Sequence, residues 1–150
     1  MDLPGYKNLG NADITTAQSG LVITSGVTSA GVSVAYLDQL AGMRALGLQT
    51  QFVYVGAGGT SAKLYVQGSI DQGATWFDIA CFAFTTASLI KTLAVEFGKC
   101  TSFTRTDGTL TDDTVANSGV VPPIDRARAK LVTVGTYDTG TQIAACGQAA

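Results

Sequence analysis

The feature that most constrains the fold of this 150-residue chain is an alternation of apolar and polar residues with a period of two. Successive side chains of a β-strand point to opposite faces, so this period predicts strands with one buried face. The clearest run is 62–70, where we expect a core face of Ala62, Leu64, Val66 and Ile70 and an outer face of Lys63, Tyr65, Gln67 and Ser69. In 44–55 the expected core residues are Leu46, Leu48, Phe52 and Tyr54, with Gln49 and Gln51 on the other face.

Six further segments have the length and composition of strands, namely 21–24, 31–37, 76–84, 90–97, 126–134 and 141–146. Short strands separated by turns rich in Gly, Asp and Thr are typical of sandwiches. The sequence therefore predicts an all-β fold, an antiparallel β-sandwich of about eight strands. A jelly roll is one candidate topology.

Two segments lack a sustained alternation. Residues 1–19 are polar and contain Pro4, Gly5 and Gly10, which predicts an extended N-terminal arm beside a β-sandwich domain at 20–150. The tract 98–121 is irregular and too long for a routine hairpin connection. We expect the arm and this tract to contact neighbouring subunits.

Charged residues make up only 13% of the chain, and its net charge is −2. A soluble domain of this size usually carries about 25% charged residues, so we expect other subunits to cover part of the surface, in a homo-oligomer or larger assembly. Nucleic acid is not an expected partner, because its phosphates require a basic face. A membrane is not expected either, since the apolar runs are shorter than a spanning helix needs. A leader peptide is also not expected at the start of the chain, which indicates synthesis in the cytoplasm.

The chain has no His and three Cys, at positions 81, 100 and 146. Without His, a Ser-His-Asp or Cys-His catalytic site cannot form. A structural zinc site needs four Cys or His ligands at short paired spacings, so we expect neither a metal nor another cofactor. Acidic pairs such as Asp112 and Asp113 are expected to be solvated loop residues. The sequence therefore predicts no catalytic residue and a protein that is not an enzyme; a disulfide remains open.

The sharpest local motif is the spacing S-x-D-x-G-x-T-W, formed by Ser69, Asp71, Gly73, Thr75 and Trp76. In such a turn the Asp accepts N–H hydrogen bonds, the Gly takes a positive φ and the Trp packs beside the hairpin. The motif resembles the Asp box of sialidases and other propellers, which repeat it blade after blade. It occurs here once, in a chain too short for four blades, so we interpret it as a structural hairpin.

Three cations alternate along the predicted strand 126–134. Arg126, Arg128 and Lys130 share one face, while the residues between them face the core. A row of this kind is either a solvated strand face or, in a protein this short of charge, a docking surface for an acidic partner. Both interpretations remain open at this stage.

Two stretches resemble small structural proteins of tailed bacteriophages. They are FVYVG at 52–56 with KLYVQGSIDQGATWFDIACFAFTT at 63–86, and RARAKLVTVGTYDTGTQI at 126–143. The resemblance implies a virion component, such as a capsid decoration (cement) protein or a minor head protein. Its partners would be the major capsid protein or neighbouring subunits.

The leading interpretation is therefore a non-enzymatic virion protein. The alternative, from another class, is a carbohydrate-binding or host-attachment module, because β-sandwiches often present aromatic rings to sugars. Trp76, Tyr54 and Tyr65 are the candidates for such contacts.

Overall fold

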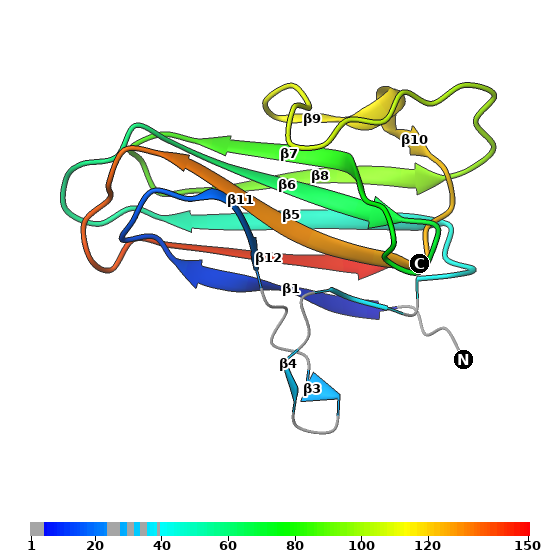
Figure 1. Ribbon diagram of the computed structural model, residues 1–150, viewed down its shortest axis with the longest axis horizontal. Coiled ribbons are helices and arrows are strands. Elements are labelled where there is room, and N and C mark those ends of the chain that lie inside the picture. Colours follow the sequence, from blue (N-terminus) through cyan, green and yellow to red (C-terminus); the bar gives the residue numbers. More distant parts are fainter. Residues whose placement is uncertain (1–4, 24–27, 30–31, 34–35, 39) are drawn as a thin grey trace.

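A computed structural model describes residues 5–23, 28–29, 32–33, 36–38 and 40–150, and they form two packed sheets of five strands each (Figure 1). Sheet A has the order β1 (Gly5–Asp13), β12 (Gln142–Ala149), β5 (Ala45–Val53), β8 (Leu89–Phe97), β10 (Val120–Val121). Sheet B has the order β2 (Ser19–Ile23), β11 (Arg126–Val134), β6 (Ser61–Ser69), β7 (Phe77–Phe84), β9 (Thr114–Val115). Two short strands, β3 (Thr28–Ser29) and β4 (Val32–Ser33), pair separately, and a 3-10 turn spans Ala116–Gly119. The predicted all-β sandwich is confirmed.

The pairing of the long strands is nested. Strand β1 pairs with β12, β2 with β11, β5 with β8 and β6 with β7, all antiparallel. The chain is thus folded in half about the β6–β7 hairpin and rolled up, so that each half of the sequence contributes strands to both sheets. This is the strand order of a jelly roll, the candidate topology named from sequence. The short β10 adds a parallel pairing on β8.

The core lies between the sheets, as the alternation predicts. Sheet A contributes Leu46, Leu48 and Phe52 of β5 and Ile143 of β12 to the buried cluster. Phe52 stacks on Phe84 of sheet B with ring centroids 5.1 Å apart. Sheet B contributes the inward residues of three neighbouring strands, which are Ala62, Leu64 and Val66 of β6, Ala127, Ala129 and Leu131 of β11, and Phe82 and Phe84 of β7.

Beyond Lys63, the outer face expected for 62–70 is also buried. Tyr65 is 4% exposed, and Gln67 and Ser69 have no exposed surface. The tract 98–121 covers this face, with backbone and side-chain contacts to β6 and β7 of its own chain. Ile70, which was expected in the core, is 57% exposed because β6 ends at Ser69. Periodicity identified the strand, but it could not show that a loop would cover the second face.

The predicted N-terminal arm is wrong over the residues described. Residues 5–13 form β1, which pairs with β12 along its whole length and forms the edge of sheet A beside it (Figure 1). A bulge between Asn8 and Gly10 turns Leu9 into the core, where it is 2% exposed, and Ile14 is fully buried. The bulge breaks the regular alternation, and so the sequence pattern did not reveal this strand. Residues 1–4 lie outside the described residues.

Other boundaries differ by smaller amounts. The segment predicted at 31–37 lies partly outside the described residues, with β4 at Val32–Ser33 and a bridge from Leu37 to Ala127. The sequence interpretation also missed β9 and β10, which are two residues each and lie within the irregular tract.

Because β1 is part of the sandwich, truncating its core side chain should destabilise the whole domain. Leu9→Ala should lower the free energy of unfolding by about 2–5 kcal/mol, the usual cost of deleting a buried Leu side chain. Urea denaturation of the purified chain measures this loss. Asn11→Ala, on the exposed side of the same strand, should cost less than about 0.5 kcal/mol. If Leu9→Ala lowers the free energy of unfolding by no more than Asn11→Ala does, residues 5–13 do not belong to the core.

Candidate functional site

The five motif residues meet in one turn between β6 and β7. Asp71 Oδ1 accepts hydrogen bonds from the Thr75 N–H at 2.9 Å and from the Ser69 hydroxyl at 2.8 Å. Asp71 Oδ2 accepts the Thr75 hydroxyl at 2.6 Å, and the Trp76 indole N–H donates to the Gly73 carbonyl at 3.1 Å. The bonds from Thr75, followed by that from Ser69, lower the pKa of Asp71 to about 2. The polar side chains of Ser69, Asp71, Thr75 and Trp76 are thus all bonded within the turn, which supports a structural role.

The three cations of β11 all have partners within the chain. The Arg126 guanidinium lies 4.6 Å from the Tyr36 ring centroid and donates to the Gln72 carbonyl. The Arg128 guanidinium lies 4.5 Å from the Trp76 ring centroid.

Lys130 forms an ion pair with Asp107 at 2.8 Å. The row is therefore an internal clamp and not a free cationic surface. Its docking role stays a prediction. Replacing these cations by acids would also break contacts that hold the hairpin and the long tract, and so would lower stability as well as any docking.

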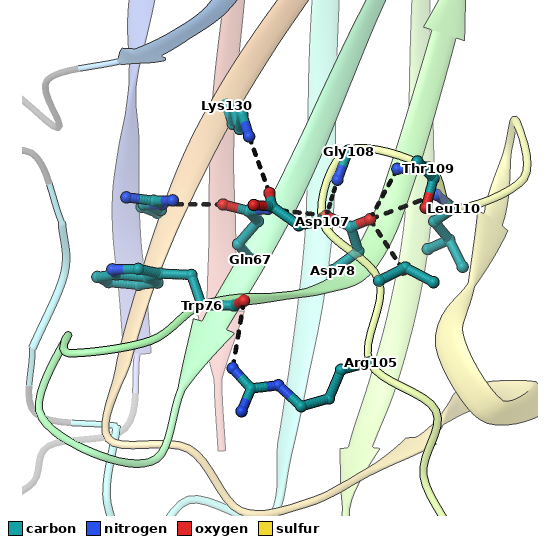
Figure 2. Close-up of polar contacts among 11 residues, drawn as sticks. Gln67, Trp76, Asp78, Arg105, Asp107, Gly108, Thr109, Leu110 and Lys130 are labelled. Atoms are coloured by element: carbon teal, nitrogen blue, oxygen red, sulfur yellow. Dashed lines mark hydrogen bonds and ion pairs between the residues drawn. The ribbon is translucent and has the colours of Figure 1, made fainter.

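Gln67 connects the clamp to a buried carboxylate (Figure 2). Its Oε1 accepts from Arg128 Nε at 2.9 Å, and its Nε2 donates to Asp78 Oδ1 at 2.9 Å and to Asp107 Oδ1 at 2.7 Å. The Lys130 ammonium, followed by the Gln67 amide, lowers the pKa of Asp107. Side chains from β6, β7, β11 and the long tract thus form one continuous polar network.

The Asp78 carboxylate is fully buried and receives its remaining hydrogen bonds from the tract. The backbone N–H groups of Gly108, Thr109 and Leu110 donate to it at 3.0, 3.1 and 3.3 Å. The hydroxyl of Thr106 adds a fourth bond at 2.9 Å. A buried charge is tolerable only when it is hydrogen-bonded in this way, so the carboxylate holds the tract against sheet B.

Two exposed ion pairs fasten the rest of the tract. Asp112 pairs with Lys63 at 2.7 Å, and Asp113 pairs with Lys91 at 2.8 Å. The backbone N–H of Ala83 also donates to Asp113. The adjacent acids that the sequence left as solvated loop residues are therefore structural anchors.

The three aromatic residues proposed for sugar contact do not form an accessible platform. Tyr65 is buried beneath the tract, and Trp76 has Arg128 against its ring and Tyr36 beside it. Tyr54 packs edge-on to Tyr137, and its hydroxyl donates to the Gly58 carbonyl. None of the three lies free on the surface for a ligand.

Sequence reasoning missed Gln67, Asp78 and Asp107, which organise the network. One signal was present, because Asp78 stands in the apolar run 77–84, where a buried acid requires partners. The identity of those partners depends on a loop about 30 residues away in sequence.

We also searched the described residues for metal-binding groups, disulfides and membrane-spanning helices. Within the described ranges no group of three or more His, Cys, Asp or Glu residues is arranged to bind a metal ion. Cys81, Cys100 and Cys146 are free thiols, and burial raises the pKa of Cys81 to about 12. Over the same ranges no helix is long and apolar enough to cross a membrane.

Comparisons with protein-family models, curated proteins and solved structures gave no match to this chain.

The buried carboxylate of Asp78 should contribute more to the free energy of unfolding than either exposed ion pair does. Asp78→Asn replaces an acceptor oxygen with an NH₂ group facing N–H donors, so it should cost about 1–3 kcal/mol. Amide hydrogen exchange should also accelerate across residues 106–110. The control Asp112→Asn, which removes one exposed pair, should cost less than about 1 kcal/mol. If both variants unfold at the same urea concentration, the buried network does not hold the tract.

The turn requires glycine at position 73. Its φ is +88°, and an added Cβ would lie 3.2 Å from Arg126 Nη1 and 3.3 Å from Trp76 Cζ2. Gly73→Ala should therefore destabilise the chain by about 1 kcal/mol or more, a fall in Tm of roughly 2–4 °C. The control Gln72→Gly relieves a φ of +59° one residue earlier and should not lower the Tm. Calorimetry that finds Gly73→Ala as stable as wild type would refute this account of the turn.

Proposed function

We propose that the protein is a non-enzymatic structural component of a tailed-bacteriophage virion, a capsid decoration (cement) protein or a minor head protein. The observation that carries the proposal is the jelly-roll strand order, an architecture used by viral capsid proteins. The low proportion of charged residues and the resemblance of 52–56, 63–86 and 126–143 to phage structural proteins support the same role.

The use made of the polar side chains also supports a structural role. The carboxylates of Asp71, Asp78, Asp107, Asp112 and Asp113 are each engaged in holding a turn or the long tract. A catalytic acid or base instead needs access to a substrate. These interactions stabilise one fixed shape, which is what a subunit docked on a shell requires. The expected partners are the major capsid protein or further copies of this chain.

The proposal is tested on purified phage particles from a lysate in which the gene is expressed. Mass spectrometry should detect the chain at a fixed ratio to the major capsid protein, and cryo-EM should show a jelly roll of this size on the shell. Particles from a gene-deleted phage should lack that density and regain it when the purified chain is added. Its absence from washed wild-type particles would refute the virion role.

The alternative, a carbohydrate-binding or host-attachment module, cannot use the three aromatic residues first proposed for it. A specific observation still favours it. The outer face of sheet A, unlike that of sheet B, is not covered by the long tract, and it has the uncharged polar side chains that sugar recognition needs.

A further inference from the structure

The outer face of sheet A contains a shallow trough of about 290 Å³ along β12, between β1 and β5. Its floor consists of the small residues Ala144 and Cys146 of β12. Polar side chains of the flanking strands form its walls, with Tyr6, Asn8 and Asn11 on β1 and Gln49 and Gln51 on β5. The alternate residues of β12 and β5 face the core, so this side of the sheet is available to a ligand.

Strand register fixes the positions of the amides. Asn8 and Gln49 are both paired with Cys146, from opposite sides, and Asn11 and Gln51 are both paired with Ala144. Each pair therefore spans two strand spacings, about 9–10 Å, and the two pairs lie about 7 Å apart along the strands. Four amides thus stand at the corners of a rectangle around a floor of small residues.

These amides are available for binding. Within the described residues the side chains of Asn11, Gln49 and Gln51 make no hydrogen bond. Asn8 uses only its Oδ1, which accepts the Gly10 N–H at 2.9 Å, so its NH₂ group is still free to donate. A ligand can therefore bond to all four without breaking the native hydrogen bonds of the strands.

The chemistry of the lining selects one kind of ligand. None of the described side chains in the trough is charged, so nothing there would offset the desolvation of an ionic ligand. An amide offers both a donor and an acceptor, which matches the hydroxyl groups of a sugar. Tyr6, at 69% exposure, supplies an aromatic ring with an apolar face at one end.

Other occupants fit less well. A lipid or apolar peptide would leave the amides desolvated and unpaired, at a cost of about 1–3 kcal/mol for each group. A second copy packed on the same face would desolvate the amides of both chains, with small residues opposite them. A neutral polyhydroxylated ligand avoids both costs.

We propose that this trough binds a neutral oligosaccharide, with Asn8, Asn11, Gln49 and Gln51 bonding its hydroxyl groups and Tyr6 packing against a sugar ring. The site lies on the opposite sheet from Trp76, Tyr65 and the cation row. The inference does not depend on the virion role. On a particle, such a site would attach the shell to neutral surface polysaccharide.

The direct test is an NMR titration of the full chain with cellotriose, maltotriose, mannotriose and chitotriose. An open trough with few contacts supports a Kd on the order of 1 mM, so the titration should extend to about 10 mM. At least one sugar should shift the side-chain amide signals of Asn8, Asn11, Gln49 and Gln51. A trimer of galacturonic acid, which is charged, should bind at least fivefold more weakly than the neutral sugar that binds best.

Variants separate the trough from the rest of the face. Gln49→Ala and Gln51→Ala remove exposed side chains, so they should leave the Tm unchanged while weakening binding at least fivefold each. The matched control is Thr92→Ala, which is exposed on the same face of β8 but outside the trough. It should bind as wild type does.

Cys146 provides an independent readout from the floor of the trough. In a Cys100→Ser background Cys81 is buried and unreactive, so alkylation reports Cys146 alone. A saturating neutral sugar should slow this reaction at least fivefold.

Three results would overturn the proposal. The first is the absence of amide shifts with all four neutral sugars. The second is binding that Gln49→Ala and Gln51→Ala do not weaken. The third is a concentration-dependent dimer with its interface on β12, which would assign the face to a second copy. Because the test uses the isolated chain, its failure would leave the virion role standing.

Discussion

The buried carboxylate of Asp78 is the interaction on which the arrangement of sheet B depends. A charge without exposed surface has to be hydrogen-bonded, and the sheet itself supplies only the Gln67 amide. The Thr106 hydroxyl and the backbone N–H groups of residues 108–110 supply the rest, so the long tract has to lie across the sheet. Once there, it buries Tyr65 and brings Asp107 to Lys130. The tract thus forms a partial third layer over sheet B.

This arrangement makes the two outer faces of the sandwich different. On sheet B the charged residues are used internally, in ion pairs and in stacking on Tyr36 and Trp76. On sheet A the central strands β12 and β5 expose mainly amides and small residues, with no covering segment among the residues described. Much of the charge therefore holds the tract, whereas the open face along β12 and β5 is polar and uncharged. On the neighbouring β8 the same face exposes Ile90 and Glu96.

The nested pairing has a further consequence for the chain ends. Because β1 pairs with β12 and β2 with β11, the first and last described strands stabilise each other across the length of the sequence. The same pairing creates the trough, since its two walls come from strands about 40 residues apart with the C-terminal strand between them. A virion subunit and a sugar-binding module would both benefit from this rigidity, because each presents a fixed surface to a partner.

The sequence by itself determined the fold class, most of the long strands and the turn at Ser69–Trp76, because these depend on local alternation and on short-range hydrogen bonds. It could not reveal β1, since the bulge at Leu9 interrupts the alternation. It placed Arg126, Arg128 and Lys130 on one strand face correctly, but their partners Tyr36, Trp76 and Asp107 come from distant segments. Tertiary structure alone decided that this row is a clamp, that Gln67 and Asp78 are buried, and that amides of β1 and β5 flank β12. Those outcomes depend on which strands become neighbours, and a period of two residues says nothing about that choice.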